Sequence, residues 1–102
     1  MTQNDKELEE EVKDKILVLL IALFPRAKIY LFGSRATGTN GEFSDIDIAI
    51  DAGERLPITD IDEANAIMEA LNIPYKVDIV DFHLVSDTMK ALILKEKVVW
   101  KD

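Results

Sequence analysis

The N-terminal segment places apolar residues at helical spacing. The repeat at every third or fourth position predicts a helix over about residues 5–24, which Pro25 ends. The positions that carry this repeat are Leu8, Val12, Ile16, Leu19, Leu20, Leu23 and Phe24. From Ile16 to Phe24 the helix is apolar on every side. Two interpretations stay open: a deeply buried helix, or a helix that also meets a partner.

Farther along the chain, β-branched and aromatic residues dominate and the period of the pattern falls to two. Asp45-Ile46-Asp47-Ile48-Ala49-Ile50-Asp51 alternates polar and apolar residues, as half-buried strands do. Turn-forming residues between 37 and 44 predict a loop before this strand. The connection is too short for a helical crossover, so the first two strands should pair antiparallel. Strands are expected over residues 28–32, 45–51, 75–82 and 97–100.

Two further helices are predicted between the later strands. Thr59 is expected to cap a helix that runs to Leu71, with Asp62 completing a capping box. The inward face of this helix would consist of Ile61, Ala64, Ile67, Met68 and Leu71. Ser86 is expected to cap the last helix. Its predicted inward residues are Met89, Leu92, Ile93 and Leu94.

The elements follow the order α-β-β-α-β-α-β, without a repeat or a linker. This order is typical of the mixed α/β (α+β) class, in which helices pack on a small mixed sheet. The chain has 102 residues, of which 48% are hydrophobic. Residues 1–102 are therefore expected to form a single domain.

Composition and charge restrict the partners of the chain. Twelve Lys and Arg against twenty Asp and Glu give a net charge of −8, which disfavours binding to DNA or RNA. The absence of cysteine excludes disulfides, thiolate zinc sites and cysteine nucleophiles. The N-terminus does not resemble a signal peptide and the longest apolar run is too short to span a bilayer. We therefore expect a cytoplasmic protein without a membrane partner.

The first candidate for chemistry is the pair Asp45 and Asp47. They lie two positions apart in a predicted strand, so their carboxylates should leave the same face. Unneutralised, the two charges would repel each other, and this strand supplies no Lys or Arg. Oxygen ligands without a nearby His or Cys favour Mg²⁺ or Mn²⁺ over zinc. The pair therefore predicts a site for a divalent cation.

The second candidate is the turn Gly33-Ser34-Arg35, which follows the first predicted strand. Gly33 permits a sharp turn and a close approach of the backbone, and Ser34 offers a hydroxyl and an amide. A helix is expected to start at Arg35-Ala36, and the start of a helix attracts anions. A carboxylate pair that faces such a turn is arranged for a metal-bound triphosphate.

Asp78 interrupts an otherwise apolar strand, and a buried acid needs an explanation. If this strand lies beside the second one, Asp78 would be a third ligand of the cation, with Asp45 and Asp47. It would then also lie next to a hydroxyl that attacks the bound triphosphate. Asp81 has the opposite parity in the strand and should point elsewhere.

These residues resemble the nucleotidyltransferase superfamily related to DNA polymerase beta, and most closely its minimal nucleotidyltransferases. The shared pattern is a hydrophobic residue, Gly-Ser, a spacer, Asp-x-Asp, and a later Asp on a neighbouring strand. The resemblance implies a nucleotidyltransferase fold and a Mg²⁺-dependent enzyme that transfers AMP from ATP to a hydroxyl. It implies two metal ions held by Asp45 and Asp47, with Asp78 on the catalytic ion. It also implies a triphosphate contact at Ser34, within the nucleotide-binding turn of Gly33, Ser34 and Arg35.

The resemblance also implies a protein partner. Larger relatives hold their acceptor with a second domain, whereas minimal members resemble antitoxins that add AMP to a separate helical HEPN-domain protein, often a toxin ribonuclease. An oligomer with that partner is then expected. Two alternatives stay open. One is an antitoxin that covers its partner without catalysis, and the other is an enzyme that modifies a small hydroxylated molecule.

Five further residues have less specific interpretations. Arg35 is either a phosphate contact or an exposed first-turn arginine. Asp51 is expected to be a solvated acid at a strand end, and His83 to pack in a loop or lie at the surface. Lys76 is interpreted as a strand-edge lysine, with a phosphate contact as the alternative. Trp100 is expected in the core.

Overall fold

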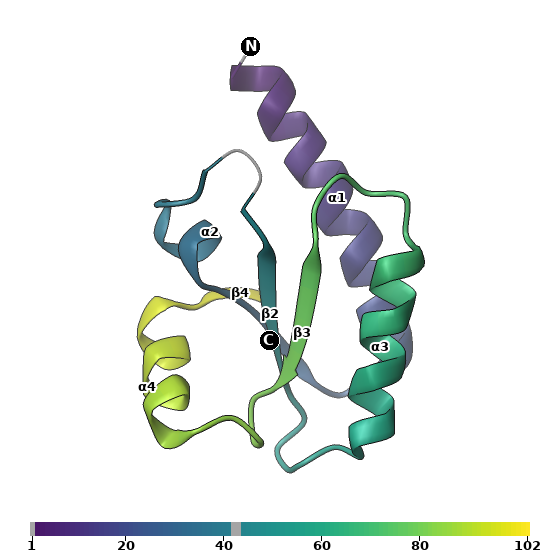
Figure 1. The fold of residues 1–102 in the computed structure, drawn as a ribbon, viewed down its shortest axis with the longest axis vertical. Coiled ribbons are helices and arrows are strands. Elements are labelled where there is room, and N and C mark those ends of the chain that lie inside the picture. The colour runs from purple at the N-terminus through teal and green to yellow at the C-terminus, as the bar shows by residue number, and fades with distance from the viewer. Residues whose placement is uncertain (1, 42–43) are drawn as a thin grey trace.

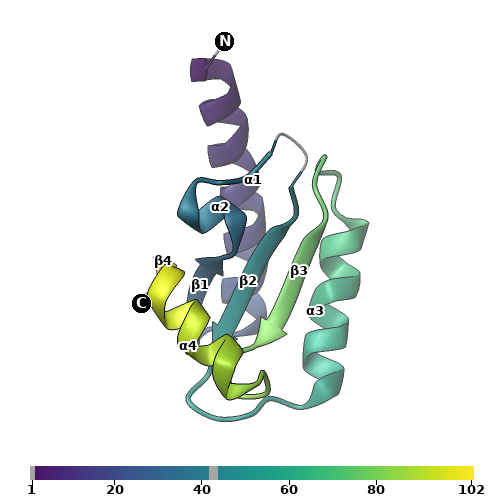
Figure 2. The same ribbon diagram turned by 60° about the vertical axis from the view of Figure 1, so that its left-hand side comes forward.

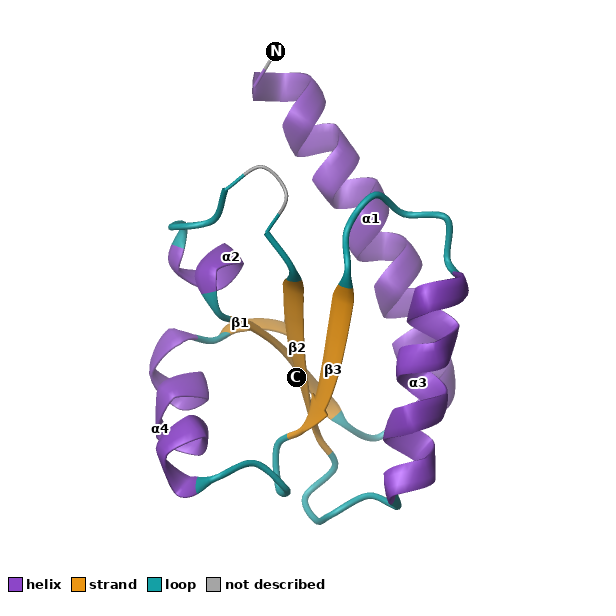
Figure 3. Cartoon of the chain, in the orientation of Figure 1, coloured by secondary structure: helices purple, strands orange, loops and turns teal. Residues whose placement is uncertain are grey.

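In a computed structural model of the chain, a four-stranded sheet carries helices on both faces (Figures 1 and 3). The structure describes residues 2–41 and 44–102, with side chains from residue 10 onward. The elements are α1 (Thr2–Leu23), β1 (Lys28–Phe32), α2 (Ser34–Thr37), β2 (Ile46–Asp51), α3 (Ile58–Ala70), β3 (Val77–Asp81), α4 (Asp87–Glu96) and β4 (Val98–Lys101). Apart from the single turn of α2, this is the predicted order. The predicted packing of Leu8 and residues 42–43 of the predicted loop lie outside what is described.

The sheet is mixed and has the strand order β3-β2-β1-β4. The strand β1 pairs antiparallel with both β2 and β4, which confirms the predicted pairing of the first two strands. The strands β2 and β3 run parallel. In this register Phe32 lies opposite Asp47, and Asp47 lies beside Asp78. The end of β1 and the starts of β2 and β3 therefore meet at one end of the sheet.

One face of the sheet packs against α1 and α3, which lie together on that side in Figure 1. The helical repeat of α1 buries Val12, Ile16 and Leu20 against it. The outer side of α1 leaves Val18 at 67% and Ile21 at 40% exposure. The inner side of α1 is thus buried, as the first interpretation requires, whereas a partner on its outer side stays a prediction. No helix among the described residues is long and apolar enough to cross a membrane.

The opposite face carries α4 and the short α2 (Figure 2). Ile93 of α4 packs into a cluster with Tyr30, Phe32, Ala49 and Phe82. Of the four α4 residues predicted to face inward, Ile93 alone is buried. The prediction is wrong for the other three, because α4 meets the sheet along a single stripe. The exposed residues are Met89 (37%), Leu92 (44%) and Leu94 (51%).

The two predicted helix caps have different outcomes. Ser86 caps α4 as predicted, and its hydroxyl accepts a hydrogen bond from the Met89 N–H at 3.1 Å. The predicted Thr59 cap and its capping box with Asp62 are wrong. The helix α3 begins at Ile58 after Pro57, which makes no side-chain capping bond. The ring of Pro57 presets the backbone just before the helix, so Thr59 already lies inside the first turn.

Candidate active site

Asp47 lies at the centre of the candidate site, on β2 between β1 and β3. Its side chain is half-buried, whereas the side chains of Asp45 and Asp78 are exposed. Asp78 is its direct neighbour on β3, which confirms that the third strand lies beside the second. β2 begins at Ile46, so Asp45 stands just ahead of the strand rather than within it. The two flanking acids are open to solvent on either side of Asp47.

The three acids share one electrostatic environment. Burial raises the pKa of Asp47 above its ordinary value of 3.8, and the carboxylates of Asp78 and Asp45 raise it further. The positive charge of Lys76 acts in the opposite direction and lowers it. Among the described residues, no three acidic or histidine side chains form a ready-made metal cage. The carboxylates are therefore neighbours that repel one another.

Gly33 brings the backbone close to Asp47. Its φ of 77° lies in the region that favours glycine, and a Cβ placed there would lie 2.5 Å from Asp47 Oδ2. Its carbonyl accepts hydrogen bonds from the N–H groups of Ala36 (3.0 Å) and Thr37 (3.2 Å), which close the turn of α2. The helix thus begins at Ser34, one residue before the predicted start. A larger residue at position 33 would collide with the carboxylate.

Arg35 has a bracing role that neither interpretation anticipated. Its Nε donates to the carbonyl of Ser44 at 2.9 Å, and its guanidinium lies 4.3 Å from the centre of the Tyr75 ring. Arg35 is half-buried and joins the loop after α2 to the segments that precede β2 and β3. Its contact with a nucleotide stays a prediction.

The donor set fits a hard divalent cation. Asp47 and the flanking Asp45 and Asp78 offer carboxylate oxygens, which Mg²⁺ and Mn²⁺ prefer. Burial, followed by the charges of Asp78 and Asp45, raises the pKa of Asp47, and Lys76 lowers it. A cation at this position would relieve the repulsion.

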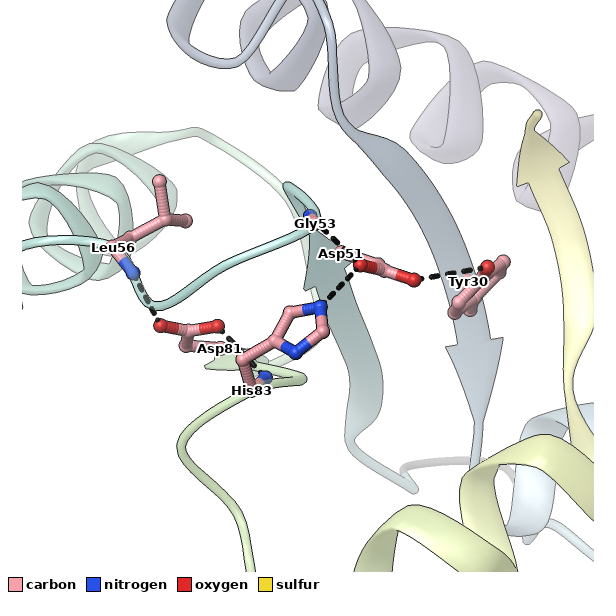
Figure 4. Close-up of polar contacts among 6 residues, drawn as sticks. All are labelled: Tyr30, Asp51, Gly53, Leu56, Asp81 and His83. Carbon is pink, nitrogen blue, oxygen red and sulfur yellow. Dashed lines mark hydrogen bonds and ion pairs between the residues drawn. The ribbon is translucent and has the colours of Figure 1, made fainter.

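A second polar cluster occupies the other end of β2 (Figure 4). Asp51 accepts hydrogen bonds from the Gly53 N–H (3.0 Å) and the Tyr30 hydroxyl (3.4 Å), and its Oδ1 lies 2.6 Å from His83 Nε2. Asp51 is therefore held in place by hydrogen bonds, and the prediction of a solvated acid is wrong. Burial tends to raise its pKa, but the bonds from Gly53 and His83, with Lys28 nearby, lower it on balance.

Asp81 points away from the candidate site, as its parity predicts. It is buried, and it accepts hydrogen bonds from the Leu56 N–H at 2.7 Å and the His83 N–H at 2.9 Å. The sequence predicted that His83 packs in a loop or lies at the surface, and its pairing with Asp51 was missed. No local signal reveals this pair, because the two residues meet only through the parallel register of β2 and β3.

The fold and the residues around Asp47 define a nucleotidyltransferase domain. The chain belongs to the family described as polymerase beta, nucleotidyltransferase, which it matches over residues 6–102. Members of this family generally use divalent metal ions. The predicted family and fold class are thus confirmed.

More particularly, the chain is a homologue of MntA. It is 28% identical over 93 residues to the probable protein adenylyltransferase MntA of Haemophilus influenzae, covering 91% of this chain and 82% of that protein. It is also similar to a chain of a toxin–antitoxin crystal structure with AMP-PNP (TM-score 0.72, 32% identity, 88% and 73% of the two chains). The chain is likewise similar to a chain in a structure of a tri-AMPylated Shewanella oneidensis HEPN toxin in complex with MNT antitoxin (TM-score 0.67, 28% identity, 100% and 74% of the two chains).

Proposed function

We propose that this chain is a Mg²⁺-dependent nucleotidyltransferase that moves AMP from ATP to a hydroxyl of a partner protein. The observation that carries the proposal is the meeting of Asp47, Asp78 and Gly33 at one end of the sheet. In the polymerase beta nucleotidyltransferase family, such an arrangement suits a metal-bound nucleoside triphosphate. Similarity to a probable protein adenylyltransferase favours AMP as the group transferred and a protein as the acceptor.

Asp45, Asp47 and Asp78 would hold the metal, which we propose to be two Mg²⁺ ions with Mn²⁺ as a substitute. When bound, the ions neutralise the charge of the triphosphate and make a nearby hydroxyl more acidic. The carboxylates suit this role because Asp78 and Asp45 repel the charge of Asp47, and a bound cation would neutralise this repulsion. They also lie at an open surface that a substrate can reach.

The turn at Gly33 and Ser34 would hold the triphosphate. Gly33 lets the backbone approach the phosphates, and Ser34 supplies a hydroxyl and an amide as donors. Arg35 would keep this turn in place through its bonds to the following loop. A direct contact between Arg35 and phosphate would add to that role.

Asp78 would assist the attacking hydroxyl. The acceptor oxygen forms a bond to the α-phosphorus, and the bond from that phosphorus to the bridging oxygen of pyrophosphate breaks. Pyrophosphate leaves with the electron pair, and the hydroxyl proton passes to the carboxylate of Asp78. Because Asp78 is exposed, it can release the proton to water.

The acceptor would be a helical HEPN-domain protein, with this chain acting as its antitoxin. Support comes from the similarity to chains in toxin–antitoxin structures, one with AMP-PNP and one with an AMPylated HEPN toxin. A Tyr, Ser or Thr hydroxyl on that partner would receive AMP. A reaction that consumes ATP fits a cytoplasmic location.

Intact-mass spectrometry of the partner tests the proposed reaction. With the chain, ATP and Mg²⁺, the partner should gain the mass of one or more AMP groups. Asp45→Asn or Asp47→Asn should remove nearly all turnover. Asp78→Asn should slow the reaction by about 100-fold or more while nucleotide binding is partly kept. Ser34→Ala should be milder, because the backbone amides remain.

The contrary outcomes are distinct. Tight binding to the partner without any gain of mass would leave only a non-catalytic antitoxin. A nucleotide added to a small molecule in the absence of protein would favour the small-molecule enzyme. A gain of mass that survives Asp45→Ala would contradict the assigned site.

A further inference from the structure

Lys76 stands on the same face of the sheet as the carboxylates. It lies two positions before Asp78, and Val77 between them is buried on the α1 side. Residues two apart in an extended chain face the same side, so Lys76 shares the face of Asp78 and Asp47. Its carbonyl accepts a hydrogen bond from the Ile46 N–H at 2.8 Å, which continues the β2–β3 ladder to this point. The backbone of Lys76 is thus fixed beside the start of β2.

The ammonium group of Lys76 is available for a ligand. Its side chain is exposed, and it forms no ion pair within 4.0 Å with the carboxylates of the described residues. Lys76 therefore contributes positive charge to the site without being committed to one acid.

Lys76 and the Gly33–Ser34 turn flank Asp47 from its two neighbouring strands. The turn follows β1, whose last residue Phe32 pairs with Asp47, and Lys76 precedes β3 on the other side. A triphosphate tail held by the turn would lie between the two. The long flexible stem of a lysine and its compact charge suit contact with phosphate oxygens.

We propose that Lys76 binds the β- and γ-phosphates of the nucleotide from the β3 side of the site. The inference rests on the proposed function. Lys76 would neutralise charge on the pyrophosphate as it leaves, in addition to holding ATP before the reaction. It would be a binding residue for the substrate tail and would not contact the transferred AMP group.

Comparison of ATP and AMP binding separates this role from a structural one. Calorimetry on the whole chain in Mg²⁺ would measure both affinities for wild type, Lys76→Met and Lys76→Arg. Lys76→Met should weaken ATP binding on the order of tenfold, the effect of losing one charge-assisted contact. AMP binding should change by less than about twofold, because AMP lacks the phosphates in question. Lys76→Arg should keep most of the ATP affinity.

Lys15→Met is the matched control. Lys15 is an exposed lysine on α1, which lies on the opposite side of the sheet. Because both variants replace a lysine with methionine, they make the same change in net charge. Its ATP affinity should equal that of wild type. Unchanged ATP affinity in Lys76→Met, or equal loss of ATP and AMP affinity, would overturn the inference and leave the proposed function intact. Failure of wild type to bind ATP with Mg²⁺ would overturn both.

Discussion

A hydrogen atom is all that Gly33 can carry on the side that faces Asp47. Gly33→Ala should therefore displace the carboxylate or the turn, since the new methyl would lie 2.5 Å from Asp47 Oδ2. A shift of about 1 Å in an active site can cost 100-fold in rate, and we expect a loss of about that size. The positive φ adds about 1–3 kcal/mol of strain. Transfer assays and thermal melting measure the two effects.

Gly53→Ala provides the control for backbone strain. Gly53 has a φ of 82°, and a Cβ there would meet nothing within 4 Å. This variant should lose similar stability but keep its activity. Equal activity in the two variants would show that the close approach at Gly33 is unimportant.

Asp47 is the residue where charge repulsion and metal binding oppose each other. Its raised pKa means that the folded state favours the protonated carboxyl over the ionised one. Ionisation therefore lowers the free energy of unfolding as pH rises above the ordinary pKa of 3.8 towards neutral pH. Mg²⁺ at ten times its dissociation constant should restore about 1.4 kcal/mol, or about 5–10 °C in melting temperature. Asp47→Asn should abolish this response and leave the metal-free protein at least as stable. Equal shifts in both proteins would argue against the metal site.

Asp51 should show the opposite dependence on pH. Its pKa is lowered by Gly53 and His83 against the effect of burial, with Lys28 and the Tyr30 hydroxyl also facing it. The stabilisation is therefore present above 3.8 and lost as pH falls through the lowered pKa. Asp51→Asn should cost about 1–3 kcal/mol at neutral pH, the usual effect of losing hydrogen bonds to a charged group. Urea unfolding should show this difference shrinking as pH falls below 3.8 and through the lowered pKa, and a constant difference would contradict the assignment.

At the scale of elements, substitutions at the starts of α4 and α3 should change the free energy of unfolding by different amounts. Ser86→Ala removes the acceptor for the Met89 N–H and should cost about 1 kcal/mol in the free energy of unfolding. Thr59→Ala should cost less than about 0.5 kcal/mol, because Thr59 does not cap α3. Chemical denaturation of both variants measures the difference. A larger loss for Thr59→Ala would restore the cap that the sequence suggested.

The elements were predictable where local periodicity sufficed. The alternation in β2 set which of its residues face α1, and the Gly-Ser turn with Asp47 located the candidate site. The start of α3 depended on Pro57, whose fixed backbone competes with a Thr cap. The residues of α4 that face inward depended on the area of the sheet that α4 covers, which the sequence does not show. The two side-chain partners of Asp51, Tyr30 and His83, lie 21 and 32 positions away, so only the register of the strands brings them together.

At the scale of the whole molecule, exposed apolar side chains concentrate near the C-terminal end. Six of them are Leu84, Met89, Leu92, Leu94, Val98 and Val99, against Val18 and Ile21 on α1 and Ile58 on α3. The helix α4 lies on the face that carries the aspartates, whereas α1 lies on the other. A protein that presents a hydroxyl to Asp78 must cover the aspartate face, so we expect the acceptor to contact α4.

Paired aspartate variants test this contact. Leu92→Asp should weaken both partner binding and AMP transfer by about tenfold or more, as loss of a buried apolar anchor does. Val18→Asp should leave both unchanged, and neither exposed substitution should lower the melting temperature appreciably. The reverse result would assign docking to the outer side of α1.

The edge position of β4 predicts that parts of the molecule differ in local stability. The strand β4 joins the sheet through β1, and Lys101 Nζ bonds the carbonyl of Ala27 across 74 positions. Contacts over such a separation are slow to form, because loop closure must come first. Amide hydrogen exchange should therefore be faster in α4 and β4 than in β2, which is paired on both sides. We therefore expect Asp47 to lie in the part that opens last, and α4, which packs on the same face of the sheet, in the part that opens first.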